Sequence, residues 1–137
     1  MTFVKKSAAA FAIAALAACA SMGGGMQLSL TGADEVPPVS TQASGSGSIA
    51  IGEDGAVSGS VTTAGMNGVA AHIHMAPRGQ NGPVIVPLTK TGDSTWGPAA
   101  GAKLNEAQMA AFKAGNLYVN VHSPEHKGGE IRAQLQP

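Results

Sequence analysis

Short segments of alternating polar and apolar residues, separated by turn-forming clusters, limit this chain to a fold built from short strands. Glycine alone accounts for 19 of the 137 residues, and aromatic residues for only 4%. The strongest hairpin signal is the turn Gly52-Glu53-Asp54-Gly55 between segments 45–51 and 56–63. Pro37 and Pro38 restrict this part of the chain to an edge strand or a loop. Further strands are predicted at residues 27–31, 69–75, 84–88, 116–123 and 130–135.

One helix is predicted between these strands. Asn105 can cap it, Gln108 can return the hydrogen bond, and Gly115 suits the left-handed residue that ends a helix. About seven short strands with turns between them predict an all-β fold. We expect an antiparallel, Greek-key-like β-sandwich or flattened barrel, with one short helix before the penultimate strand.

The first residues have the pattern of an export signal. Lys5 and Lys6 precede an apolar stretch at 8–18, which is too short for a permanent membrane helix. The stretch ends in Leu16-Ala17-Ala18-Cys19, which resembles the lipobox of bacterial lipoproteins. We therefore expect a signal peptide at 1–18, a lipidated Cys19, a flexible tether at 19–25 and one domain at 26–137. The alternative is an ordinary secretory signal in which the cysteine occurs by chance.

This prediction places the protein at the cell envelope. The lipid on Cys19 would attach it to a membrane, the outer one in preference to the inner, facing the periplasm or the cell surface. A lipidated Cys19 leaves no thiol for a disulfide, a nucleophile or a metal thiolate, because the chain contains one cysteine. Removing 1–18 leaves six basic and eight acidic residues without a basic run, so no nucleic-acid partner is expected.

Three histidines form the most informative pattern. His72 and His74 project from the same face of a strand, whereas Ile73 projects from the other. The later strand alternates in the same way, with Leu117, Val119 and Val121 toward the core and Tyr118, Asn120 and His122 away from it. If the two strands are neighbours, three imidazoles meet outside the core, and such a set suits Cu(II), zinc or nickel. The alternative is an ordinary solvated face.

Other candidate residues have simpler interpretations. His126 can be a fourth ligand or a solvated loop residue, and Met75 is expected to pack in the core rather than bind metal. Glu130 can orient an imidazole through a hydrogen bond, pair with a cation or meet only solvent. The acidic pair Asp34-Glu35 lies in a predicted turn, where solvated acids are ordinary.

Several separated motifs resemble the CHRD (chordin-type) domain, in the same order and at the same spacing from about residue 26 to 136. They are Glu35-Val36-Pro37-Pro38, Ala71-His72-Ile73-His74, Gly79-Gln80-Asn81-Gly82-Pro83-Val84, Gly115-Asn116-Leu117-Tyr118-Val119-Asn120-Val121-His122 and Gly129-Glu130-Ile131-Arg132. The resemblance implies an exported β-sandwich, but no settled activity.

A more distant similarity is to the copper/zinc superoxide dismutases. It implies copper ligands at His72, His74 and His122, with zinc as the other candidate. The segment 76–83 is short and carries no histidine, so the bridging imidazole and the zinc ligands of a dismutase have no counterpart there. We therefore expect a copper protein for metal handling, storage or delivery, and not an efficient enzyme. Two alternatives stay open: a non-metal module that binds an envelope partner through residues 77–83, and a reduced dismutase-like copper enzyme.

Overall fold

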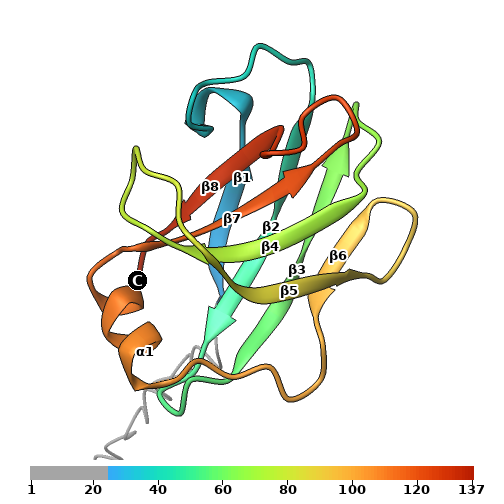
Figure 1. Cartoon of the computed structure of the whole chain (residues 1–137). Coiled ribbons are helices and arrows are strands. Elements are labelled where there is room, and N and C mark those ends of the chain that lie inside the picture. The colour runs from blue at the N-terminus through green and yellow to red at the C-terminus, as the bar shows by residue number, and fades with distance from the viewer. Residues whose placement is uncertain (1–24) are drawn as a thin grey trace, which may run out of the picture.

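The computed structural model describes residues 25–137 (Figure 1). The predicted signal peptide, Cys19 and all of the tether except Gly25 lie outside the described residues. Within residues 25–137, no helix has the length and apolar character that a membrane crossing requires.

The described chain forms eight strands and one α-helix, in agreement with the predicted class. The elements are β1 (Met26–Leu30), a 3-10 turn η1 (Gly32–Asp34), β2 (Ser44–Ile51), β3 (Val57–Ala64), β4 (Ala70–Met75), β5 (Val84–Lys90), β6 (Thr95–Pro98), α1 (Glu106–Lys113), β7 (Leu117–His122) and β8 (Ile131–Leu135). The short helix precedes the penultimate strand, as predicted.

All strand pairs are antiparallel and belong to one sheet in the order β1-β2-β3-β6-β5-β4-β7-β8. In β3-β6-β5-β4 three consecutive strands return to lie beside a fourth, which is the Greek-key arrangement. Residues Thr31 and Arg132 then join the two ends of the sheet, because the backbone N–H of each donates to the carbonyl of the other, at 3.1 and 2.9 Å. The sheet is therefore a nearly closed barrel (Figure 1).

One local prediction is confirmed, and one strand was missed. The capping box of α1 is confirmed: Gln108 N–H donates to Asn105 Oδ1 at 2.8 Å, and Asn105 N–H donates to Gln108 Oε1 at 2.9 Å. Strand β6 was not predicted, because Thr95–Pro98 is short and contains a glycine and a proline. It is held by pairing with β3 and β5, which a local pattern does not reveal.

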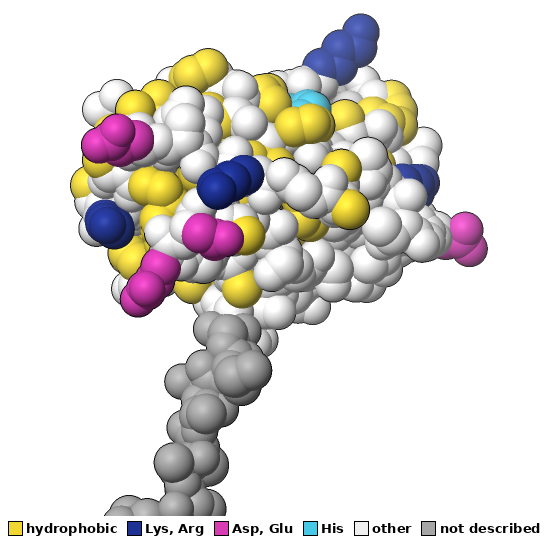
Figure 2. Space-filling model, turned by 90° about the horizontal axis from the view of Figure 1, so that it is seen from below, with side chains coloured by type: hydrophobic (Ala, Val, Ile, Leu, Met, Phe, Trp, Pro, Cys, Tyr) yellow, Lys and Arg dark blue, Asp and Glu magenta, His cyan; other side chains and the backbone are white. Residues whose placement is uncertain are grey.

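The interior of the barrel is apolar and comes from every strand. Leu30, Ile49, Val61, Ile73 and Val119 are fully buried there. On the face seen from below in Figure 2, acidic and basic side chains are interspersed with hydrophobic ones and form no single basic patch.

The opposite face of β7 and β8 is also buried, which argues against the alternative of an ordinary solvated face. Tyr118, Asn120 and His122 do point away from the apolar core, but segments 31–43, 76–83 and 123–130 contact this face. Arg132 is fully buried among them. These three segments therefore give β4, β7 and β8 a second, polar interior.

Candidate metal centre

Two neighbouring strands position the three histidines. Strand β4 carries His72 and His74, and β7 carries His122. The register places His122 opposite Ala70 and Asn120 opposite His72, so His122 lies diagonally across from His72 on the same face. The two strands are neighbours, which is the condition that a shared three-histidine site requires.

The three imidazoles converge on one point. Nδ1 of His72 lies 3.0 Å from Nε2 of His122, and one nitrogen from each ring lies within 4.8 Å of the other two. Two nitrogens bound to one ion at about 2.0–2.1 Å lie at most about 4.2 Å apart. Three ligands of one ion cannot all lie that far apart, so side-chain adjustments of about an ångström bring the three nitrogens to one metal ion.

Backbone carbonyls orient two of the rings. Nδ1 of His74 donates to the carbonyl of Gly82 at 2.9 Å, and Nδ1 of His122 donates to the carbonyl of Lys127 at 2.8 Å. A carbonyl only accepts, so each Nδ1 carries the proton and each Nε2 presents a lone pair toward the cluster. Nε2 of His74 is buried and makes no well-aligned hydrogen bond within residues 25–137, although the Asn120 side chain lies close to the ring.

Burial also sets the protonation of the cluster. Desolvation lowers the pKa of His72, and the neighbouring His122 and His74 lower it further. Desolvation likewise lowers the pKa of His74, with His122 and Arg132 adding to the effect and the hydrogen bonds of Gly82 and Asn120 opposing it. Both rings are therefore neutral at neutral pH, which is the form that binds a metal ion.

A stack of side chains supports His74 from behind. Its ring lies parallel to that of Tyr118, with centroids 4.7 Å apart, and the Arg132 guanidinium lies 3.4 Å from the Tyr118 ring centroid. The Tyr118 hydroxyl accepts a hydrogen bond from Gly82 N–H at 3.1 Å. The same glycine thus contacts both the histidine and the tyrosine, which fixes segment 76–83 against the site.

The remaining candidate residues lie outside this cluster. His126 lines a separate cavity, Met75 is half-buried against the apolar core, and Glu130 accepts a hydrogen bond from Thr41 Oγ1 at 2.7 Å. Among residues 25–137, the one group of three or more histidine or acidic side chains close enough to share an ion is the histidine triad.

Glu35 was wrongly expected to be a solvated turn residue. Its side chain is only 3% exposed and accepts a hydrogen bond from Asn120 Nδ2 at 3.4 Å. A Cβ atom on Gly129 would overlap both Glu35 and Asn120, so glycine at position 129 is what lets them meet. The pair Gly128-Gly129 was the available sequence signal, but it does not identify the partner.

Comparison with known families gives one match. The family model for the CHRD domain matches residues 26–135, which includes all three histidines and Glu35. No curated protein and no solved structure matches the chain.

Proposed function

The chain belongs to the CHRD domain family, and we propose that its domain binds a transition metal, copper in first place, through His72, His74 and His122. In this proposal the metal is cargo that the protein holds for handling or delivery. Imidazole ligands suit copper and zinc, and copper(II) generally binds a given nitrogen site more tightly than zinc. Zinc is therefore the competing ion in any test.

The observation that carries the proposal is the convergence of the three imidazoles, in which Nε2 of His74 is buried without a well-aligned hydrogen bond. A buried acceptor without a partner costs about 1–3 kcal/mol. Here that cost falls on an atom whose ring is held by Gly82 and stacked on Tyr118, with two more imidazoles beside it. A metal ion at the centre of the three rings gives this atom the partner that it lacks.

Metal binding requires a proton to move. His72 Nδ1 and His122 Nε2 are 3.0 Å apart, and since Nδ1 of His122 holds its proton against Lys127, the proton between them belongs to His72. A metal ion bound to both atoms displaces this proton, which can transfer to Nε2 of His72. His72 is the most exposed of the three histidines, so solvent can accept or supply that proton.

Elemental analysis and Cu(II) EPR test the copper site. We expect about one copper per wild-type chain with nitrogen hyperfine structure from imidazole. His72→Ala, His74→Ala and His122→Ala each weaken copper binding more than about 100-fold, beyond the 10–100-fold typical of residues that only orient a ligand. His126→Ala is the matched control and keeps full occupancy. Equal copper content in the wild type and the triple variant contradicts the proposal.

We further propose that acyl chains on Cys19 attach this domain to a membrane of the cell envelope. The lipobox-like residues 16–19 support this part of the proposal. Mass spectrometry of the protein from a bacterial membrane fraction should find Cys19 as the diacylglycerol-modified first residue. Cys19→Ala should move the protein out of the membrane fraction without changing the copper content of the domain. An unmodified cysteine in a membrane-free protein contradicts the anchor.

A further inference from the structure

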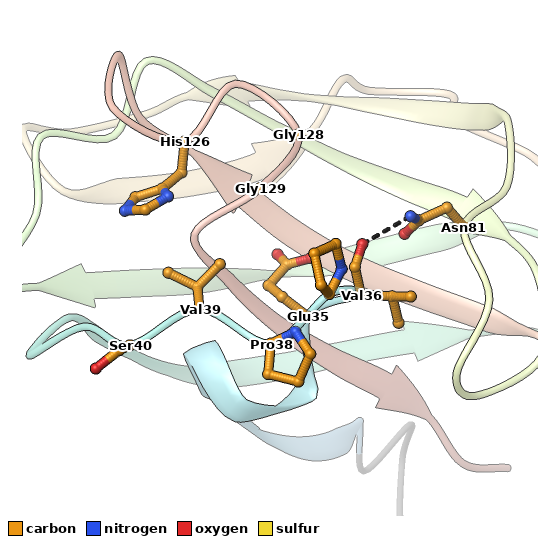
Figure 3. A pocket seen from close by; sticks show the side chains of 10 residues that line it. Glu35, Val36, Pro38, Val39, Ser40, Asn81, His126, Gly128 and Gly129 are labelled. Atoms are coloured by element: carbon orange, nitrogen blue, oxygen red, sulfur yellow. Dashed lines mark hydrogen bonds between the residues drawn. The ribbon is translucent and has the colours of Figure 1, made fainter.

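A second polar site lies beside the metal centre and is not explained by it. A cavity of about 430 Å³ is formed by residues 35–40, Asn81 and residues 126–129, and none of the three site histidines lines it (Figure 3). Its volume falls within the range of about 300–1,000 Å³ that is usual for small-molecule sites. One wall is the Glu35-Val36-Pro37-Pro38 motif, which the proposed metal site does not use.

A carboxyl group forms the base of this cavity. Glu35 points beneath Gly129, with His126 and Val39 on one side and Asn81 on the other (Figure 3). The glycine at 129 keeps open the space that the Glu35 carboxyl and the Asn120 amide occupy, because any side chain there would overlap both. The bond from Asn120 is long, at 3.4 Å, and reaches only Oε1, and the Val36 backbone is the other hydrogen-bond donor near the carboxyl. Two carboxylate oxygens offer about four acceptor sites, so the carboxyl keeps acceptor capacity for another group.

No cation within residues 25–137 forms an ion pair with Glu35. The ion pair found there joins Asp34 to Arg78 at 3.5 Å. Arg132 on β8 attracts Glu35 at longer range, but its guanidinium donates to Gln80 and Asn81 and covers Tyr118. Burial raises the pKa of Glu35 to about 7, with Asp34 adding to the rise and Asn120, Arg132 and the Val36 backbone opposing it. When this carboxyl is ionised, it thus lacks a close counter-charge.

We propose that this cavity binds an alkylammonium group, from a small amine or from a lysine side chain of a peptide, with its nitrogen on the Glu35 carboxylate. Three N–H donors of an ammonium group can serve the free acceptor sites of the carboxylate through short, charge-assisted bonds. The side chains of Val36, Pro38 and Val39 supply apolar surface for the attached methylene groups (Figure 3). An anionic ligand is excluded by the same carboxylate, which is the one acidic side chain that lines the cavity.

NMR titration of metal-free, ¹⁵N-labelled protein tests the proposal in a buffer free of amines. The first pair of probes is n-butylammonium chloride and 1-butanol, which share their shape and differ in charge. The second pair is an acetylated, amidated Gly-Lys-Gly peptide and the same peptide with norleucine at its centre. We expect saturable shifts of the Val39, Gly128 and Gly129 amides with a cationic probe, and none with its neutral partner.

Glu35→Gln is the decisive variant, because an amide keeps the size of the side chain and its acceptor for Asn120. It should weaken binding of the cationic probe at least about tenfold. Glu130→Gln is the matched control: Glu130 is buried, hydrogen-bonds Thr41 and lies outside the cavity lining, so this variant should bind like the wild type. Amide resonances of both variants that are dispersed like those of the wild type, apart from those near the substituted residue, show that they are folded.

The two pairs of probes distinguish the sources of the ammonium group. Shifts with the peptide alone identify a lysine of a protein partner, and shifts with butylammonium identify a free amine as a sufficient ligand. The proposal is overturned if neither cation gives a saturable shift at these amides, or if Glu35→Gln binds as well as the wild type. Because the experiment contains no metal, its result is independent of the copper proposal.

Discussion

Strands β4 and β7 have two buried faces that are built from opposite kinds of residue. One face consists of aliphatic side chains, among them Ala71, Ile73, Val119 and Val121, and closes the barrel core. The other carries the histidines, Tyr118 and Asn120, and its cover consists of loop segments rather than strands. The first face is closed by apolar packing. The second is largely buried beneath hydrogen-bonded loops, with His72 partly exposed and a few polar atoms left without a hydrogen bond.

The difference between the faces indicates which one carries function. An apolar face gains stability from burial at roughly 25 cal/mol per Å² and needs no ligand. A buried polar face contributes little net stability. Each buried donor or acceptor without a hydrogen bond lowers the free energy of unfolding. The polar face of this domain contains atoms of His74 and Asn120 without well-aligned hydrogen bonds, and it contains Glu35, which has no ion-pair partner within residues 25–137. We therefore expect stability to depend mainly on the first face and ligand binding mainly on the second.

The largest expected effect is on the apolar face. Ile73→Ala removes a fully buried side chain that points into the core between the two site histidines. Loss of buried methylene groups and the resulting cavity should lower the free energy of unfolding by about 2–5 kcal/mol. Urea denaturation followed by tryptophan fluorescence of Trp96 measures this, since Trp96 packs in the same core.

Ile73→Val is the control for that substitution. It should cost only about 0.5–1.5 kcal/mol and leave copper stoichiometry unchanged. An Ile73→Val variant that is stable but binds no copper would show that the two faces are not separable.

The second effect is a dependence of stability on pH, which comes from Glu35 on the polar side of the domain. The Glu35 carboxyl has its pKa raised to about 7 in the folded protein, from an ordinary value of 4.5. Between pH 4.5 and 7 the unfolded chain loses this proton while the folded chain keeps it, so stability falls as pH rises. The full loss, reached above pH 7, is about 3 kcal/mol.

Comparison of the wild type with Glu35→Gln isolates this contribution. The difference in unfolding free energy between the two proteins should change by that amount between about pH 4 and pH 8, with the Glu35→Gln variant relatively more stable at the higher pH. A difference that does not vary with pH would mean that Glu35 titrates normally and that its site is open to water.

The sequence predicted the apolar face better than the polar one, for a physical reason. Alternation along β4 and β7 predicted which residues share a face, including the convergence of His72, His74 and His122. Alternation does not report what covers a face, so the burial of Asn120 and Arg132 and the role of segment 76–83 were not predicted. Glu35 was misjudged because its burial depends on Gly129, which is distant in sequence.

The third effect is stabilisation by the metal itself. Copper at about 100 times its dissociation constant should raise the unfolding free energy of the wild type by about 2.7 kcal/mol. His74→Ala should show no such gain, whereas Ile73→Val should show all of it, since position 73 faces away from the site. Thermal unfolding with and without copper measures the gain. Equal stabilisation of the His74→Ala variant would place the copper elsewhere on the protein.

The smallest effect tests how segment 76–83 is linked to the metal centre. Tyr118→Phe keeps the ring that stacks on His74 and carries Arg132, and removes only the hydroxyl that accepts from Gly82 N–H. Loss of this bond should cost about 1 kcal/mol of stability in urea denaturation. Because the Gly82 carbonyl orients His74, copper affinity measured against a competing chelator should fall about tenfold.

Thr41→Val is the matched control for Tyr118→Phe, because it removes hydrogen bonds within the segments that cover the same polar face. Thr41 Oγ1 donates to Glu130 and accepts from Ala43 N–H, and neither Thr41 nor Glu130 hydrogen-bonds Gly82 or a site histidine. It should lose at least as much stability as Tyr118→Phe and keep wild-type copper affinity. If both variants lose copper affinity equally, any loss of a hydrogen bond on the polar face weakens copper binding. The orientation of His74 by Gly82 then has no special effect on copper affinity.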